Sequence, residues 1–264
     1  MKKIIQILIV FITVLGLVRC DIIDESERYI EMKRVPINKN ILLMYFTDQR
    51  CVNCPEASIL IKEMIQEYDG ALISVSIHSY YGSFLPAMNL LTEQGTEYDA
   101  HFNKDKFHPI GSIDGQVAVR TEQWRANIRS RFEEFENTES PVGIELSTEY
   151  DPITGIYNIK SSITGYDDTN NLKLMLWVVE SNIVSIQQTP NGVNRDYVHN
   201  HIFREAITDT WGNDISVEKG KIVETENPLV LNNEYDAKNV TIIGFIYNSN
   251  TYEVYQTTEI HLIN

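Results

Sequence analysis

The stretch that decides the fold is ILLMYFTDQRCVNCPEA, residues 41–57. Its first part, residues 41–46, is an unbroken apolar run, which is typical of a strand buried on both faces of a sheet. Two cysteines follow in a CxxC pattern, Cys51 and Cys54. Residues 55–68 then carry apolar side chains at helical spacing, and the proline at their first position suits a helix start. The sequence therefore predicts a strand, a CxxC turn and an amphipathic helix in succession.

The segments on the carboxyl side of this helix continue the alternation of strands and helices. An Asp-Gly pair between two short apolar runs is a strong hairpin signal. The expected segments are a buried strand (71–77), a polar and aromatic insertion (79–105) with helices at 87–92 and 96–102, a hairpin (110–119) and a closing helix (124–135). A strand, a helix and a second strand of this length suit a right-handed parallel crossover.

The pattern changes character near Glu139-Ser140-Pro141, beyond which β-type alternation with frequent turns predominates. About seven short strands of this kind favour an antiparallel sandwich of immunoglobulin-like architecture. The predicted fold class is therefore α/β plus all-β. The expected division is a signal peptide (1–20), an acidic tether and first strand (21–39), an α/β domain (40–139) and a β-sandwich domain (140–264).

The CxxC pair admits three interpretations. A zinc site would need two more ligands, and the sequence has neither a second CxxC nor a suitably spaced histidine pair nearby. A structural disulfide across so short a loop would contribute only about 2 kcal/mol. A redox pair suits the position, because the start of a helix stabilises a thiolate and Arg50 acts in the same direction, although Asp48 opposes it.

Residues 41–135 resemble a thioredoxin-like domain. The strings ILLMYFT (41–47) and CVNCPEA (51–57), together with YVHNH (197–201), are similar to the outer membrane protein 28 family of Bacteroidetes lipoproteins. This resemblance covers nearly all of the chain after the signal. It implies a thioredoxin-like domain followed by an immunoglobulin-like one, in an outer-membrane or surface lipoprotein.

The thioredoxin-like resemblance also implies a cis-proline facing the cysteine pair. Pro109 stands in the matching place, after the insertion and before the hairpin, although an ordinary strand-entry proline would look the same. His108 could then approach the thiols and favour the thiolate when protonated. The candidate redox site is therefore Cys51, Cys54, His108 and Pro109.

Three departures weaken the case for redox catalysis. Arg50 replaces the tryptophan that active thioredoxins carry before the first cysteine, and Asp48 replaces the family's usual glycine. Tyr45 replaces a buried aspartate that relays protons. These changes remove the usual proton-handling partner and make efficient turnover harder.

The N-terminus resembles a lipoprotein export signal. Two lysines precede an apolar stretch of about 15 residues, shorter than the roughly 20 that span a bilayer, which favours a cleaved signal over an uncleaved anchor helix. Leu17-Val18-Arg19-Cys20 is similar to a lipobox, in which Cys20 becomes the lipidated first residue, although Arg19 is larger than the usual residue. The acidic residues 21–27 are either a solvated linker or a surface-export signal.

Charge and motif content limit the other functions. The formal charge of −15 disfavours nucleic acid, and the sequence has no glycine-rich phosphate loop for a nucleotide. No cofactor is expected. His199 and His201 could share a strand face as a weak candidate metal pair, but exposed or packed histidines are commoner. Acidic clusters at 167–168 and 209–214 lack EF-hand spacing, so solvated turns are preferred to calcium sites.

Two functions remain open on the sequence. One is a binding or interaction module, anchored to the outer membrane by its N-terminal lipid on the periplasmic or cell-surface side, with a protein or glycan ligand. The other is an envelope thiol–disulfide oxidoreductase using Cys51 and Cys54. The degraded redox surroundings favour binding, so an enzyme is the alternative and not the leading hypothesis.

Overall fold

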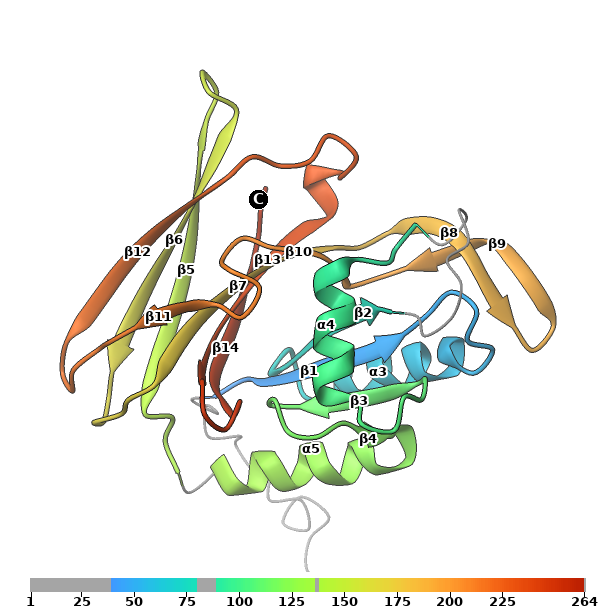
Figure 1. The fold of residues 1–264 in the computed structure, drawn as a ribbon, viewed down its shortest axis with the longest axis horizontal. Helices are drawn as coiled ribbons and strands as arrows, with labels where there is room; N and C mark the ends of the chain where they lie inside the picture. The colour runs from blue at the N-terminus through green and yellow to red at the C-terminus, as the bar shows by residue number, and fades with distance from the viewer. Residues whose placement is uncertain (1–38, 80–88, 136–137, 264) are drawn as a thin grey trace, which may run out of the picture. The chain divides into compact units, whose positions relative to one another are not determined.

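The fold is mixed α/β and consists mostly of β-sheet, as Figure 1 shows. A computed structural model describes residues 39–79, 89–135 and 138–263, and these contain three α-helices. The first half comprises β1 (Ile41–Thr47), α3 (Cys54–Glu67), β2 (Leu72–His78), α4 (Glu93–Phe102), β3 (Ile110–Ile113), β4 (Val119–Arg120) and α5 (Thr121–Phe135). The second half comprises β5 (Val142–Asp151), β6 (Ile156–Gly165), β7 (Leu172–Glu180), β8 (Ile183–Thr189), β9 (Gly192–His199), β10 (Ile202–Ala206), β11 (Asn213–Ile215), β12 (Ile222–Leu229), the 3-10 helix η1 (Ala237–Asn239), β13 (Val240–Asn248) and β14 (Val254–His261).

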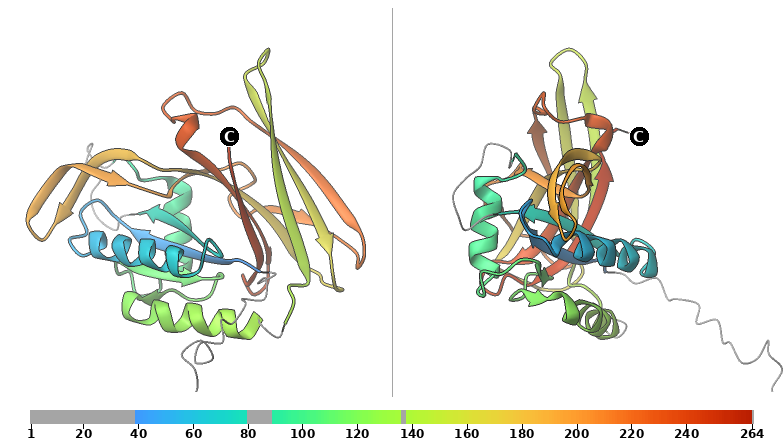
Figure 2. Two further views of the ribbon diagram at one scale, coloured as in Figure 1. Left: turned by 180° about the vertical axis from the view of Figure 1, so that it is seen from behind. Right: turned by 90° about the vertical axis from the view of Figure 1, so that its right-hand side faces the viewer.

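Strand β1 is covered on both faces, which explains its unbroken apolar sequence. Its odd-numbered residues pack with α3 and α5, whereas its even-numbered residues pack with α4 and with strands of the second half. The right-hand view of Figure 2 shows α4 on the opposite side of the sheet from α3. Because neither face meets water, no polar position is needed along the strand.

The sheet around β1 has the order that the predicted crossover requires. β1 pairs in parallel with β2 and antiparallel with β3, and β3 pairs antiparallel with β4. The strands predicted at 41–46 and 71–77, the first strand of the hairpin predicted at 110–119 and the closing helix are present, whereas the second hairpin strand is only Val119–Arg120. The expected helix at 87–92 is not found in its described part, because residues 89–92 are not helical. Helix α4 begins instead at Glu93, where the Thr92 hydroxyl accepts a hydrogen bond from the N–H of Gly95 at 2.9 Å.

Strands from the second half extend the same sheet. β10 pairs in parallel with β2 through Ile202 and Ser76 and antiparallel with β7, which in turn pairs with β13. In the described residues this gives one nine-stranded sheet in the order β14-β13-β7-β10-β2-β1-β3-β4, with β11 also paired to β7. The described residues between positions 39 and 263 accordingly belong to a single compact unit.

A second sheet, β12-β6-β5, packs against the β7–β13 part of the large sheet. The apolar core between them includes Ile144, Ile163, Leu176, Val178 and Ile242. Alternate residues of β6 are buried, as expected for a sheet with one face on the core. The remaining two strands, β8 and β9, form a hairpin outside both sheets, at the end of β1 where the CxxC turn begins (Figure 1).

A buried ionic cluster joins the start of β1 to the hairpin turn and to α5. The carboxylate of Asp114, which is fully buried, pairs with Lys39 at 3.1 Å and with Arg131 at 3.4 Å. The same carboxylate accepts a hydrogen bond from the N–H of Leu42 at 2.9 Å. Burial raises the pKa of Asp114 and lowers that of Lys39, while each group's attraction to the other opposes its shift. The Asp-Gly turn is therefore also an electrostatic anchor for β1.

Candidate functional site

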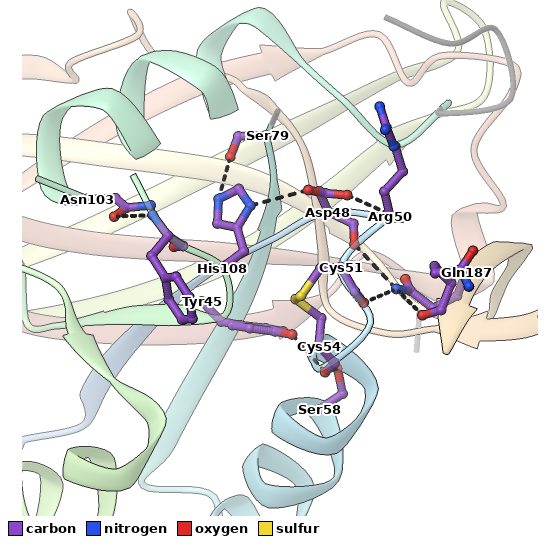
Figure 3. The surroundings of a disulfide bond; sticks show 12 residues. Tyr45, Asp48, Arg50, Cys51, Cys54, Ser58, Ser79, Asn103, His108 and Gln187 are labelled. Atoms are coloured by element: carbon purple, nitrogen blue, oxygen red, sulfur yellow. Dashed lines mark hydrogen bonds and ion pairs between the residues drawn. A yellow bond between two sulfur atoms is a disulfide. The ribbon is translucent and has the colours of Figure 1, made fainter. Parts of the chain in front are cut away.

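Cys51 and Cys54 form a disulfide where β1 gives way to α3 (Figure 3). Cys54 is the first residue of α3 and is buried, whereas Cys51 in the preceding turn is half-buried. The residue before the helix, Asn53, makes no side-chain capping bond to it. The first N–H groups of α3 therefore keep the partial positive charge that favours a thiolate when a disulfide is reduced.

Tyr45 lies beside the disulfide in the position where the thioredoxin-like resemblance places an aspartate. Its hydroxyl donates a hydrogen bond to the backbone oxygen of Cys54 at 2.9 Å. Complete burial raises the pKa of Tyr45 well above its ordinary value. The phenol therefore stays protonated and cannot accept a proton from a cysteine as a carboxylate would.

His108 lies on the other side of the CxxC turn, where Figure 3 shows it between Ser79 and Asp48. Two carboxylates hold it, those of Asp48 and Asp99. The peptide bond from His108 to Pro109 is cis. Nδ1 of the ring lies 3.4 Å from Oδ2 of Asp48, and Nε2 lies 3.2 Å from Oδ2 of Asp99. Burial lowers the pKa of His108, but the hydrogen bonds and charges of the two aspartates outweigh it and raise the pKa to about 9. His108 is therefore an imidazolium at neutral pH.

The same cluster contains a serine, so its contacts follow the order of a nucleophilic triad. Ser79 Oγ lies 3.1 Å from Nε2 of His108 and donates to Oδ2 of Asp99 at 2.5 Å. A triad needs a neutral histidine that accepts the serine proton. Here the histidine is already protonated, and Ser79 is fully buried. The cluster is therefore structural and does not indicate a hydrolase.

The charge of this cluster opposes a thiolate at Cys51. Two carboxylates, Asp48 and Asp99, face one imidazolium, so the cluster carries a net negative charge. Asp48 also accepts a hydrogen bond from the backbone N–H of Arg50, which fixes its carboxylate beside the CxxC turn. His108 thus neutralises aspartates and does not supply the surplus positive charge that would activate a cysteine.

The β8–β9 hairpin is hydrogen-bonded to the CxxC turn, although 136 residues separate the partners. The Gln187 side chain donates to the backbone oxygens of Cys51, at 2.9 Å, and Asp48, at 3.3 Å (Figure 3). The N–H of Gln188 donates to the backbone oxygen of Gln49 at 2.7 Å. The turn is therefore held from the second half of the chain.

A cavity of about 560 Å³ lies between α3 and β9, on the side of the disulfide that Cys54 occupies. We call it the disulfide-side cavity. This volume falls within the range of about 300–1,000 Å³ that is usual for small-molecule sites. Its lining residues come from β1, α3, β2, β8, β9 and the start of β10, and most are polar or apolar without charge. They are Tyr45, Thr47, Cys54, Pro55, Ser58, Ile59, Ile61, Lys62, Ile65, Gln66, Ser76, His78, Asn182, Gln187, Tyr197, Val198, His199, Asn200, His201 and Ile202.

Two histidines meet in the wall of this cavity. The rings of His78, at the end of β2, and His199, at the end of β9, have centroids 5.4 Å apart at an interplanar angle of 69°. Burial lowers the pKa of His78 well below its ordinary value, and it lowers that of His199 to about 4. Both rings are therefore neutral at pH 7. Nδ1 of His78 is buried without a hydrogen-bond partner among the described residues.

Comparison with known proteins identifies the family. The model of the family described as outer membrane protein Omp28 matches residues 97–262, more than half of the chain. The chain belongs to the outer membrane protein Omp28 family. The matched region includes His108, Pro109 and the Tyr197–His201 motif, whereas the disulfide lies before it. Among curated proteins, none matches the chain.

Two solved structures that are similar to this Omp28 family member share its fold at low sequence identity. HBP35 of Porphyromonas gingivalis has 15% identity and a TM-score of 0.67, over 84% of this chain and 75% of that chain. A protein from Agrobacterium tumefaciens has 15% identity and a TM-score of 0.56, over 83% of this chain and 93% of that one. A domain of the outer membrane lipoprotein Omp28 from Porphyromonas gingivalis has 17% identity and a TM-score of 0.31, over 46% of this chain and 87% of that chain.

Membership of the Omp28 family makes this an exported outer-membrane protein, as the N-terminal sequence predicts. The signal, Cys20 and the acidic tether lie outside the described residues. Within the part that the structure describes, no helix is long and apolar enough to cross a membrane.

The structure brings most of the sequence-predicted site residues into one region. Cys51, Cys54 and His108 lie around the CxxC turn, and His199 and His201 line the cavity beside it. Their catalytic and metal-binding roles stay predictions. Across the described residues, no group of three or more histidine, cysteine or acidic side chains is arranged to hold a metal ion.

The acidic clusters considered for calcium are partly engaged by lysines. Asp167 pairs with Lys219 at 3.0 Å, and Asp214 pairs with Lys173 at 3.0 Å. These contacts fit solvated turns, which are the interpretation that the sequence favours.

Sequence reasoning missed several residues that shape the site. His78 could have been found, because the carboxyl ends of the parallel strands β1 and β2 meet at one edge of the sheet. Asp99 and Gln187 carry no comparable signal, since each reaches the site only through long-range packing.

Proposed function

We propose that this protein is a lipid-anchored binding protein of the outer membrane, with its ligand site in the disulfide-side cavity. The observation that carries this proposal is His78, a buried side chain in the cavity wall. It is only 3% exposed, and its Nδ1 lacks a partner among the described residues. Buried polar atoms are normally hydrogen-bonded, so an unpaired one beside a cavity suggests that a ligand supplies the partner.

The composition of the cavity wall supports ligand binding. Hydroxyl groups of Thr47, Ser58 and Tyr197 and side-chain amides of Gln66 and Asn200 can form oriented hydrogen bonds. Apolar side chains from α3 and β9 stand between them. A wall of this mixed type is usual for small-molecule sites.

The finer architecture is part of this proposal. We interpret β1 to α5 as a thioredoxin-like domain, supported by the strand order β2-β1-β3-β4 with helices on both faces. We interpret the packing of β12-β6-β5 on β7 and β13 as an immunoglobulin-like sandwich. On this interpretation β10 joins the two, because it pairs with a strand of each.

The anchor and the partners follow from the sequence. Lipid on Cys20 would hold the chain at the membrane after cleavage of residues 1–20, and the acidic residues 21–27 would act as the tether. Besides a small ligand, a protein or a glycan remains a possible partner, on the periplasmic or the cell-surface side. Nucleic acid and nucleotides are disfavoured by the charge of −15.

A fragment screen on the mature chain tests the binding proposal. Hits are detected by saturation-transfer NMR and then repeated on two variants of strand β9. Val198→Trp adds bulk to a residue that lines the cavity, whereas Val193→Trp adds it to an exposed residue of the same strand that does not. We expect hits that lose binding only in Val198→Trp. Hits that bind both variants equally, or no hits at all, contradict the proposal.

Thiol–disulfide exchange is the second candidate function. The exposure of the two cysteines favours it. Cys51, in the turn before α3, is half-buried, whereas Cys54 is buried. In this arrangement the outer thiol attacks a partner and the inner thiol resolves the mixed disulfide. The charge balance at Asp48, Asp99 and His108 and the protonated Tyr45 argue against efficient turnover. A Cys54→Ser variant should then trap mixed disulfides, whereas Cys51→Ser should trap none. Equal absence of trapped partners in both variants excludes the activity.

A further inference from the structure

We propose that the ligand of the disulfide-side cavity is a small organic carboxylate, held between Lys62 and the His78–His199 pair. This inference rests on the proposed binding function and names its ligand class. Lys62 is exposed on α3 at the edge of the cavity, while the two histidines are buried in its wall.

The distribution of charge points to an anion. The chain has 37 acidic and 22 basic side chains, so carboxylates outnumber cationic groups overall. Among the described residues that line the cavity, however, none is acidic and Lys62 alone carries a permanent charge. A cation would therefore find no counter-ion there, whereas an anion would meet a lysine and several hydrogen-bond donors.

The ionisable groups that act on the His78 ring are basic residues, like Lys62 at the edge of the cavity. After burial, the groups that lower the pKa of His78 are His199 from β9, His108 from the segment before β3, and Arg204 from β10. Both groups are paired with carboxylates, Arg204 with Glu180 at 3.4 Å and His108 with its two aspartates, so among the described residues Lys62 remains the uncompensated positive charge at the cavity. His201, at the edge of the cavity, is a third histidine there, and burial lowers its pKa as it lowers those of His78 and His199.

An anion would also make the two buried rings easier to protonate. His199 makes backbone hydrogen bonds with Ile186 and Ser185, and the unpartnered ring nitrogen next to the cavity is Nδ1 of His78. In the free protein burial holds the pKa of His199 near 4, and the ring is neutral above about pH 5. A carboxylate beside the rings favours the imidazolium, so binding takes up a proton. The affinity should therefore rise as the pH falls, by at most about tenfold per pH unit for each proton.

The apolar part of the wall gives the ligand its organic portion. Ile59 is 62% exposed and Val198 is 47% exposed, and they stand on opposite sides of the cavity, on α3 and β9. Ile65 continues the apolar surface along α3. A ring or short hydrocarbon chain can pack between these side chains while its carboxylate reaches the polar wall.

Benzoate and benzamide test this inference because they share size and shape and differ in charge. Each is titrated into the mature chain between about pH 5.5 and 7.5, a range in which only benzoate is an anion, while the histidine ring signals are followed by NMR. We expect saturable shifts of His78 and His199 with benzoate, with a Kd that tightens as the pH falls. Benzamide should bind at least about tenfold more weakly and without pH dependence.

Two pairs of variants locate the effect. His199→Gln should weaken benzoate and flatten its pH dependence, whereas His261→Gln, on β14 outside the cavity, should change neither. Lys62→Gln should weaken benzoate about two- to fivefold, as expected for one exposed charge, and Lys221→Gln should leave it unchanged.

Three results would overturn the inference. They are equal binding of benzoate and benzamide, no binding of either at about 10 mM, and binding that His199→Gln leaves unaltered. In each case fragment hits that respond to Val198→Trp would leave the proposed binding function standing. Failure of the function itself would appear as the absence of any such hit.

Discussion

The pairing of His108 with two aspartates predicts a specific pH dependence of stability. In the folded protein the pKa of His108 is raised to about 9, whereas an unfolded histidine has a pKa near 6.5. The folded state therefore binds the proton more tightly than the unfolded state. The contribution of the protonated His108 to stability is therefore fully present below about pH 6.5 and is lost as the pH rises through 9.

The size of this effect follows from the two pKa values. A difference of about 2.5 pH units corresponds to about 3 kcal/mol at about 1.36 kcal/mol per unit. No large reduction for solvent screening applies, because the His108 side chain is only 7% exposed and that of Asp99 is fully buried. We therefore expect the free energy of unfolding to fall by about 3 kcal/mol between about pH 6.5 and 9.5 through this residue alone.

Urea denaturation of the mature chain at a series of pH values measures this change. A His108→Gln variant is the control, because all other titrating groups remain and the difference between the two profiles isolates His108. His261→Gln should follow the wild-type profile, since this ring is exposed and its hydrogen bond with Thr241 lies at the surface. Parallel profiles for wild type and His108→Gln would show that His108 is not a buried imidazolium and would refute the reasoning.

The remaining predictions concern the two contacts that join distant parts of the chain. Asp114→Asn should lower the free energy of unfolding by about 3–5 kcal/mol in a denaturant titration, because it leaves the buried Lys39 without its counter-charge. An effect below about 1 kcal/mol would contradict that account. Gln187→Ala should destabilise by about 1–2 kcal/mol and speed reduction of the disulfide by dithiothreitol, because it removes the donor to the Cys51 oxygen. Gln188→Ala, which keeps its backbone bond to the turn, should reduce at the wild-type rate.

The local part of the fold could be predicted because the signals were local. The buried run of β1, the helical spacing of α3 and the Asp-Gly turn each depend on a few neighbouring residues. The start of α4 was placed less well. Its Thr92 cap lies beside an insertion whose weak apolar pattern did not separate one helix from two.

The partners of the site residues could not be read in the same way. His108 was expected near the thiols, and the structure shows that its charge is taken by Asp48 and Asp99. His199 was weighed with His201, two residues away, but the histidine ring that it contacts in the cavity wall is that of His78 on β2. Spacing along a strand reports which side chains share a face, but not which element packs opposite them.

The sequence by itself determined the order of strands and helices in the first half, the position of the cysteine pair and the family to which the chain belongs. Only the tertiary structure decided that β10 joins both halves in one sheet, that Gln187 holds the CxxC turn, and that a cavity whose described lining residues include no carboxylate lies beside Cys54. The physical reason is the distance along the chain over which each interaction acts. Hydrophobic periodicity and turn chemistry act between near neighbours, whereas burial, charge pairing and cavity shape depend on which distant segments pack together.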